Sequence, residues 1–429
     1  MDWTAVRFGR RGAVAVVAAA ALGMSACSSS SGTSSTSAAA GGGLPATINV
    51  VSINPQTGPA AFAGLAANKG YDLAIKEIND SKFLGSTTLT FSKVDTKGDI
   101  KTAASSASTA IADKNVSAIF GSVSSQEAIA MSPLVQQAGL PTIYTQAGSD
   151  GVVVGDATYR ATPLMRTYYS LVKKYVQEKG WKSVGIIHTA AAPTLVDIGT
   201  KALPAIATEL GMTVTTTVAV QGTTQDFAAP ISQVLASKPD GVAILLVGAQ
   251  NPTAMKQLRQ AGYTGDVLGN SGASAGNLKP AGADGAGMVW PVDFNFQQKA
   301  EASQKFVKAY QAANSGENPL NYAAEAYDAA WFLAKSIKAA GSADRAKIKA
   351  AMATVASEKF DGALGNGLTW KDRDIVVPGV MIRWDGTGDV DGDGFDEATL
   401  SYQLVMGDRF TDAVDLLGQD GDDTLVGTA

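Results

Sequence analysis

The feature that most constrains this chain is a repeated alternation of short apolar runs with longer helical patterns. The first series of runs, each followed by a helical stretch, is TINVVSI (47–53), TTLTFSKVD (87–95), VSAIFG (116–121) and PTIY (141–144). Short runs of this length indicate buried strands, and the stretches between them show helical spacing. Strands that alternate with helices predict a parallel sheet covered by helices on both faces.

The same alternation then begins again and leaves extra helices at the end. The second series of runs is SVGIIH (183–188), TVTTTVAV (213–220), GVAILLV (241–247) and DVLG (266–269). Helical patterns return after residue 297, and the end from Phe360 is rich in Gly, Asp and β-forming residues. We therefore expect two doubly wound parallel-sheet lobes that share the chain. The expected extents are 46–162 with 290–372 for the N-terminal lobe, and 163–289 with 373–429 for the C-terminal lobe, joined by a three-strand hinge.

Length, charge and residue usage narrow the possible functions. The chain has 429 residues, which suits two domains, and a formal net charge of -5 with no run of Lys and Arg. Nucleic acid is therefore not an expected partner. With one Cys and one His, the chain has no means of forming an internal disulfide or the usual Cys/His zinc site. We expect a monomer without an organic cofactor.

The N-terminus predicts export. Arginines at 7, 10 and 11 precede an apolar stretch at 12–24, which is too short to span a bilayer but fits a signal peptide. The following MSAC resembles a bacterial lipobox, which implies cleavage of residues 1–26 and lipidation of Cys27. The alternative is an ordinary secretory signal with a chance cysteine. Residues 27–45 are mostly Ser, Gly and Ala, so they predict a disordered tether and an extracytoplasmic protein anchored to the membrane.

A serine-rich corner follows the third predicted strand. In IFGSVSSQEAIA, the serines at 122, 124 and 125 come directly after Gly121, where a parallel sheet forms its binding sites. Ser124 to Glu127 fits a capping box that opens a helix. The first turn of a helix has unpaired N–H groups that favour an anion such as a carboxylate. The alternatives are serines that only cap and a hydrolase, which would need His188 and lacks a G-x-S-x-G elbow.

The order of several motifs resembles a known family. The opening INVVSINPQTGPAAFAGLAANKGYDLAIKEIN, and then IFGSVSS, AGLPTI, VGIIH, DFAAPISQV, LRQAGY and NYAAEAYDAAWFLAKSIKAAGS, are similar to type I periplasmic binding proteins of the branched-chain amino-acid receptor group. That resemblance implies two lobes that close on a small solute. It also implies delivery of the solute to a membrane permease driven by an ATPase, the subunits of an ABC importer. A sensory receptor of the same fold is the alternative.

The resemblance also implies site residues. Ser125 corresponds to the family's carboxylate contact, flanked by Ser124 and Gln126. Further contacts from the same lobe are expected at 147–149, which are Ala147, Gly148 and Ser149. Phe62 faces either the cleft or the core.

The second lobe departs from the family pattern. The family places an acid and two aromatic residues around an ammonium group, and the matching positions here are Ser271, Asn251 (or Gln250) and the stretch 189–194, which begins at Thr189. Asp197 and Asp293 are the available substitutes. An unpaired buried ammonium is costly, so a carboxylate without an amine, an amide or a bulkier solute fits at least as well as leucine.

Two further features lie outside this site. His188 ends an apolar strand and either touches the solute or packs in the core. In DVDGDGFDE, the acids Asp389, Asp391, Asp393 and Glu397 have the spacing of a calcium loop. The alternative for this segment is an acidic, solvated hairpin.

Overall fold

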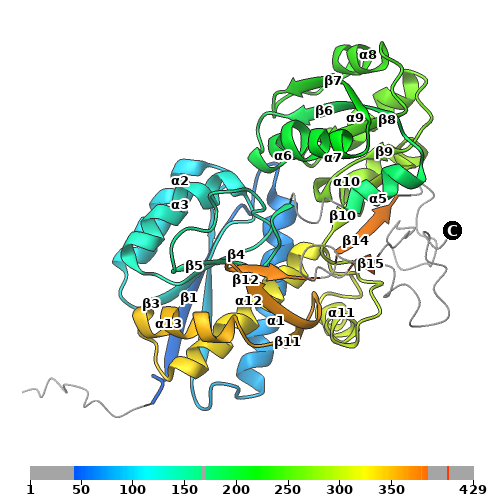
Figure 1. The fold of residues 1–429 in the computed structure, drawn as a ribbon. Coiled ribbons are helices and arrows are strands. Elements are labelled where there is room, and N and C mark those ends of the chain that lie inside the picture. The colour runs from blue at the N-terminus through cyan, green and yellow to red at the C-terminus, as the bar shows by residue number, and fades with distance from the viewer. Residues whose placement is uncertain (1–42, 166–170, 378, 385–402, 405–429) are drawn as a thin grey trace, which may run out of the picture. The chain divides into compact units, whose positions relative to one another are not determined.

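The computed structural model describes residues 43–165, 171–377, 379–384 and 403–404. Within these residues the strands form two separate sheets, one of eight strands and one of seven (Figure 1). Most neighbouring strands in each sheet are parallel and are connected through helices. This confirms the predicted class of two α/β lobes. None of the helices in the described part of the chain is long and apolar enough to cross a membrane.

The first sheet has the order β11-β12-β13-β5-β4-β3-β1-β2. Its strands are β1 Thr47–Asn54, β2 Thr88–Asp95, β3 Val116–Phe120, β4 Thr142–Tyr144, β5 Thr158–Arg160, β11 Phe360–Gly362, β12 Gly365–Lys371 and β13 Asp374–Val376. Strand β12 runs antiparallel to β11 and β13, in the part of the sequence that is rich in Gly, Asp and β-forming residues. Strand β5 was not predicted, because it is only three residues long and ends in a charged residue, Arg160.

The second sheet has the order β15-β14-β10-β9-β8-β6-β7. Its strands are β6 Ser183–Thr189, β7 Thr213–Val220, β8 Gly241–Leu245, β9 Val267–Leu268, β10 Met288–Val292, β14 Gly379–Arg383 and β15 Gln403–Leu404. Strand β10 runs parallel to β9 and antiparallel to β14.

Helices connect the strands of both lobes. Those of the first lobe are α1 Ala61–Asp80, α2 Ile100–Ala112, α3 Ser125–Ala138, α11 Glu301–Ala313, α12 Asn321–Ala340 and α13 Arg345–Val355. Those of the second are α5 Leu171–Glu178, α6 Pro193–Asp197, the π segment η1 Ile198–Ala202, α7 Leu203–Glu209, α8 Ala228–Leu235, α9 Gln250–Gln260, η2 Ser271–Ala273, α10 Ala275–Leu278 and η3 Lys279–Gly285. Asp99 and Asp344 accept the capping N–H bonds of α2 and α13.

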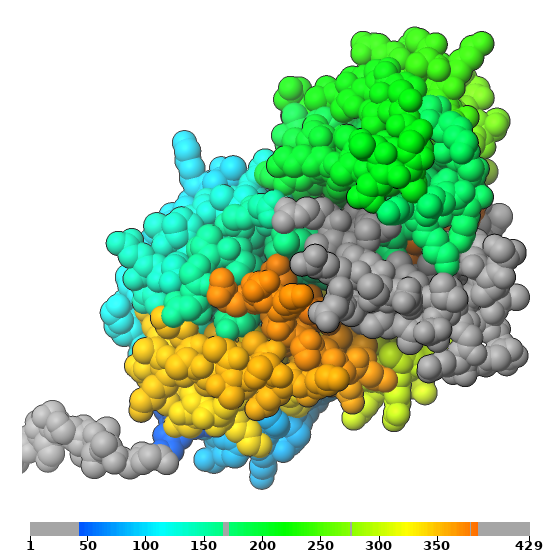
Figure 2. Space-filling view, in the orientation of Figure 1, coloured from blue at the N-terminus to red at the C-terminus, as the bar shows by residue number. Residues whose placement is uncertain are grey.

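The two lobes share the chain. Strands β11–β13 complete the first sheet, whereas β10 and β14 belong to the second. Figure 2 shows the late segments around α13 and β12 (yellow to orange) on the same body as the cyan segments near α3. The chain therefore passes between the sheets after β5, after β10 and after β13. The lobe boundaries at 162, 290 and 373 stay a prediction.

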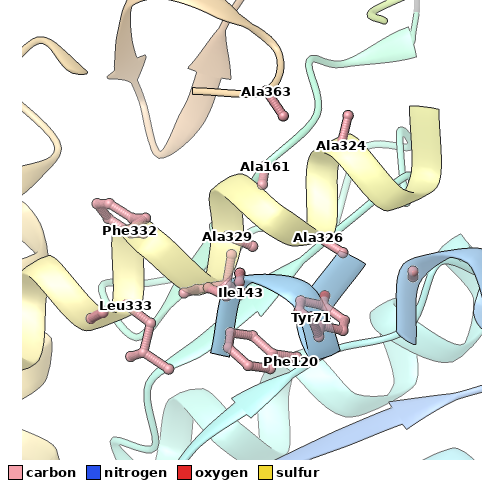
Figure 3. Close-up of a cluster of buried hydrophobic side chains, with 14 of the residues drawn as sticks. Tyr71, Phe120, Ile143, Ala161, Ala324, Ala326, Ala329, Phe332, Leu333 and Ala363 are labelled. Atoms are coloured by element: carbon pink, nitrogen blue, oxygen red, sulfur yellow. The ribbon is translucent and has the colours of Figure 1, made fainter. Parts of the chain in front are cut away.

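The core of the first lobe joins early and late parts of the sequence. Figure 3 shows Ala326 and Ala329 of α12 lying beside Tyr71 of α1 and Ile143 of β4. The ring of Tyr71 stacks on Phe120 of β3 with centroids 4.2 Å apart. All five side chains are fully buried, so α12 closes the core that the first strands begin.

Helix α1 packs closely through its small residues. A Cβ at Gly70 would lie 2.1 Å from the carbonyl oxygen of Ala323 on α12, and one at Gly64 would lie 1.8 Å from that of Pro55. Leu73, Ile75 and Ile78 are buried, whereas Leu65 is 46% exposed. The face of α1 next to α12 carries Gly and Ala instead of large side chains.

Candidate functional site

The three serines of the corner after β3 have different neighbours. The Ser122 hydroxyl is fully buried, donates to the carboxylate of Glu127 and accepts the N–H of Ser124 at 3.0 Å. Thr96 also donates to Glu127, at 2.8 Å. Burial raises the pKa of Glu127. Ser122 therefore holds the corner together and is not available to a solute.

The predicted capping box does not form. Ser124 occupies the N-cap position with an extended backbone, but its side chain makes no capping bond. The Glu127 side chain, which would complete the box, is held by Ser122 and Thr96 instead. Because these two partners surround Glu127 on its buried side, the carboxylate bonds to them and not to the N–H of Ser124.

Ser125 and Ser149 meet at a single point. Ser125 is the first residue of α3, and its Oγ lies 2.8 Å from the Oγ1 of Thr194 on α6. The Oγ of Ser149, in the loop after β4, lies 2.7 Å from the same Thr194 atom. Both serines are nearly buried. The structure thus brings together two of the predicted first-lobe residues and adds Thr194 of the second lobe.

The loop carrying Ser149 is held by a residue that the sequence prediction missed. Arg160 on β5 is 2% exposed, and its Nη1 donates to the carbonyl oxygens of Ala147 and Ser149 at 2.9 Å each. The same guanidinium pairs with Asp374 of β13 at 2.7 Å. Gly148 packs against Met165, where a Cβ would approach to 2.9 Å. Ala147 and Gly148 therefore shape the loop through their backbone. The signal in the sequence was a lone Arg between apolar and small residues.

Further side chains of the first lobe contact the second. Gln126 Nε2 donates to the carbonyl oxygen of Ala191 at 2.6 Å. Gln146 Nε2 donates to Ser271 Oγ at 3.0 Å, and the Tyr322 hydroxyl donates to the Ser271 carbonyl at 3.0 Å. The predicted residues Gln126 and Ser271 therefore lie where the two lobes meet.

Phe62 lies beside the second lobe. Its ring packs edge-on against Tyr322 with centroids 5.6 Å apart. On the other side, a Cβ at Gly248 after β8 would be 3.8 Å from Phe62 Cε1 and 3.1 Å from the Pro59 carbonyl oxygen. Phe62 is partly buried and packs against the first-lobe core as well, so it borders both the core and the second lobe.

The remaining predicted side chains of the second lobe make local bonds. Asn251 is fully buried, and its Nδ2 donates to three carbonyl oxygens of neighbouring loops, those of Leu246, Gly248 and Gly272. Gln250 Nε2 donates to two more carbonyls. Thr189 Oγ1 accepts the N–H of Ala191 at 3.2 Å. These bonds order the loops that face the first lobe.

The acids and the histidine considered as ligand contacts are engaged elsewhere. Asp197 pairs with Lys201 at 2.6 Å. The ring of His188 is 5% exposed and lies against Gly199, where a Cβ would be 3.2 Å from the ring. This contact agrees with the prediction that His188 packs in the core.

Asp293 belongs to a buried pair of carboxyl groups near the crossings between the lobes. It follows β10, accepts the hydroxyl of Thr162 at 2.7 Å and hydrogen-bonds to Glu325 of α12. Asn321 donates to Glu325 at 2.8 Å and to Gln146 Oε1 at 2.7 Å. Burial raises the pKa of Asp293 to about 6, and burial together with the charge of Asp293 raises that of Glu325. Burial and mutual repulsion therefore favour the protonated form of this pair.

Metal and lipid sites were predicted from residues that lie outside this description. Asp389, Asp391, Asp393, Glu397 and Cys27 all fall outside the described residues. Within those residues, no group of three or more His, Cys, Asp or Glu side chains is arranged to hold a metal ion. Calcium binding by residues 389–397 stays a prediction.

Comparisons with known proteins agree with this architecture. The profile of a family described as periplasmic binding protein matches residues 47–389. The chain is similar to Leu/Ile/Val-binding protein homolog 7 of Brucella abortus, at 24% identity over 75% of this chain and 84% of the relative. It is also similar to BasB of Halobacterium salinarum, a substrate-binding protein of a chemotactic signal transduction system, at 25% identity over 86% and 88%.

Solved structures show the same fold. The leucine-binding protein LivK of Thermotoga maritima superposes with a TM-score of 0.73 at 24% identity, covering 82% of this chain and 98% of that one. An ABC-transporter solute-binding protein from R. palustris in complex with benzoate gives a TM-score of 0.73 at 21% identity, covering 82% and 97%. Because the family profile spans most of the chain, this protein belongs to the periplasmic binding protein family, and it has the two-lobed type I fold.

Proposed function

We propose that this protein is an extracytoplasmic solute-binding lipoprotein of an ABC importer and that its solute carries a carboxylate or an amide. The observation that carries the proposal is the convergence of the Ser125 and Ser149 hydroxyls within 2.7–2.8 Å of one atom at the start of α3. Two hydroxyl donors beside the first turn of a fourteen-residue helix favour a carboxylate oxygen at that point.

The contacts of the second lobe favour a solute that does not depend on an ammonium group. Asn251 and Gln250 use their amide donors on loop carbonyls, and Asp197 pairs with Lys201. Asp293 is buried with Glu325. The Oγ atoms of Ser125 and Ser149 contact the hydroxyl of Thr194, and the neighbouring Gln126 carries a neutral amide. Among the structural neighbours, one is named for leucine binding and one holds benzoate, so both amino acids and simple carboxylic acids belong in the test.

A thermal-shift panel tests the solute class. It contains L-leucine, L-isoleucine, benzoate, 4-hydroxybenzoate, their amides and a set of sugars. A carboxylate or amide that binds should raise the melting temperature, because a solute at 100 times its Kd adds about 2.7 kcal/mol of stability. Stabilisation by sugars alone would contradict the proposal, and so would a panel in which no carboxylate or amide has any effect.

The membrane anchor is proposed from Cys27 and has its own test. Substituting Cys27→Ser should move the exported protein from the membrane fraction to the soluble fraction, because the thiol that carries the lipid is lost. Ser28→Ala is the matched control and should stay with the membrane. Equal distribution of Cys27→Ser and the parent chain would contradict lipid anchoring.

A sensory role is the second candidate, favoured by the similarity to a chemotactic substrate-binding protein. Uptake of a radiolabelled panel solute and chemotaxis toward it, each measured in a strain lacking this gene, separate the two roles. Loss of uptake supports import, whereas loss of chemotaxis with normal uptake supports sensing. We propose no catalytic step, since the relatives are named as binding proteins.

A further inference from the structure

Thr194 of the second lobe is bonded to both serines that we assign to the solute. Its Oγ1 lies 2.8 Å from Ser125 Oγ and 2.7 Å from Ser149 Oγ. A hydroxyl oxygen has two acceptor lone pairs, so this one atom is able to accept from both serines. A carboxylate oxygen placed there would do the same. The threonine hydroxyl therefore stands where we expect one oxygen of the solute.

The segment around Thr194 is tied to the first lobe by a second contact. Gln126, the residue after Ser125, donates to the carbonyl oxygen of Ala191 at 2.6 Å. Two successive residues of the first turn of α3 thus bond to a stretch of four residues in the second lobe. These bonds hold the two lobes together at the same place where a solute would join them.

The helix that carries Thr194 is short and follows an exposed turn. It begins with Pro193, Ala190 and Ala191 before it are exposed, and Leu195 packs into the core of the second lobe. After α6 the chain forms a π segment, in which the N–H of Leu203 bonds to the carbonyl of Ile198. Such segments interrupt the regular hydrogen-bond ladder and are frequent at functional sites. The turn with Thr194 is therefore separated from α7.

We propose that Thr194 is an internal occupant of the carboxylate site. Its hydroxyl bonds to Ser125 and Ser149 in place of a solute oxygen and favours contact between the lobes, and a bound carboxylate has to displace it. The role of Thr194 is thus to weaken solute binding and to set how much of the protein is closed before solute arrives. This inference rests on the proposed function of the two serines.

The first test needs no solute. Spin labels at Ser108→Cys on α2 and Ser232→Cys on α8, both exposed, report the distance between the lobes in full-length protein that also carries Cys27→Ser. Thr194→Val keeps the shape of the side chain but removes both hydrogen bonds. We expect this substitution to raise the ratio of molecules with a long distance between the labels to molecules with a short distance roughly threefold or more. Thr194→Ser, which keeps a hydroxyl, should resemble the parent.

A threonine in the neighbouring π segment provides the control. Thr200→Val removes an exposed hydroxyl that bonds to the carbonyl of Val196 in the second lobe, and it should leave the distances unchanged. If Thr194→Val also leaves them unchanged while remaining folded by circular dichroism, the inference is wrong. That result would not affect the proposed function, which the solute panel tests separately.

A second measurement distinguishes a competitor from a direct solute contact. Sodium benzoate and L-leucine are titrated separately into the parent and Thr194→Val. Loss of a competing hydroxyl should tighten binding of a carboxylate that the parent binds by roughly three- to tenfold. Weaker binding in Thr194→Val would overturn the inference, because Thr194 would then be a contact. If neither probe binds either protein, the distance measurement decides.

Discussion

At the scale of single residues, the serines near α3 have roles that depend on their neighbours. Ser122 is bonded to Glu127, Ser124 makes no capping bond, and Ser125 reaches Thr194 of the other lobe. The three side chains are chemically identical. The burial of each side chain and the path of the backbone decide which hydroxyl is placed to contact a solute.

This difference predicts unequal effects of two neighbouring substitutions. Ser125→Ala should weaken binding of the solute found in the panel by a factor of ten or more, about 1.4 kcal/mol, because one hydrogen bond to the carboxylate is lost. Isothermal titration calorimetry measures the change. Ser124→Ala is the matched control and should alter affinity less than threefold. Unchanged affinity in Ser125→Ala would remove this residue from the site.

At the scale of elements, α1 and α12 approach each other through small residues. Gly70 of α1 has no room for a side chain next to the backbone of Ala323, and the neighbouring residues of α12 are mostly alanines. Such close contact lets two long helices from distant parts of the sequence enclose the aromatic pair Tyr71 and Phe120. The first lobe therefore depends on both segments.

This contact predicts that Gly70→Ala destabilises the protein, whereas helix propensity alone would predict stabilisation. Alanine normally stabilises a helix relative to glycine by about 1 kcal/mol. Gly70→Ala should nevertheless lower the free energy of unfolding by about 1–3 kcal/mol, because the new Cβ forces the two backbones apart. Urea unfolding measures it. Leu65→Ala on the exposed side of the same helix should cost no more than about 0.5 kcal/mol. A Gly70→Ala protein as stable as the parent would refute the packing argument.

At the scale of the whole molecule, a buried polar chain links the crossings to the place where the lobes meet. Thr162, just after β5, bonds to Asp293, just after β10, and Asp293 bonds to Glu325. Asn321 connects Glu325 to Gln146, which bonds to Ser271 of the second lobe. Tyr71, Tyr322 and Asp328 also interact electrostatically with the pair. None of these three groups is a cation.

This pair predicts that stability decreases as pH rises. The pKa of Asp293 is raised to about 6 in the folded protein, above the value near 4 of an unfolded chain. The folded state therefore binds more protons than the unfolded chain. The resulting stabilisation is complete below about pH 4 and is lost as pH rises through about 6. For Asp293 the loss is on the order of 3 kcal/mol. Urea unfolding between pH 4 and 8 measures the slope.

Two matched variants test whether the pH dependence of stability comes from this pair or from other acids. Asp293→Asn removes one titrating group and should flatten the curve, whereas Asp80→Asn at an exposed carboxyl of α1 should run parallel to the parent. Asp328, whose pKa is raised to about 7 mainly by burial, is present in all three proteins and contributes a slope to each curve. Parallel curves for Asp293→Asn and the parent would show that the pair does not titrate in this range.

The sequence by itself determined the fold class and most of the strands and helices. Buried parallel strands must be apolar on both faces, so runs such as 183–188 and 241–247 are visible without any tertiary information. Capping residues such as Asp99 act on their own helix, so they are visible too. The serine corner at 122–125 was identified because a strand end followed by a helix start brings polar groups to one edge of the sheet. Gln126 and Ser149 were identified from the resemblance to a known family.

Only the tertiary structure decided which polar groups meet. Thr194, Arg160 and Glu325 lie far from Ser125 in the sequence, and each has a partner from another element: Ser125, the loop after β4, and Asp293. Whether Glu127 caps its own helix or bonds to Ser122 and Thr96 likewise depends on the loop after β2 packing against α3. Short strands such as β5 form for the same reason, since pairing on both sides supplies what three residues lack. Local pattern reports on the hydrogen bonds and packing within one element, whereas bonds between elements exist only after the chain has folded.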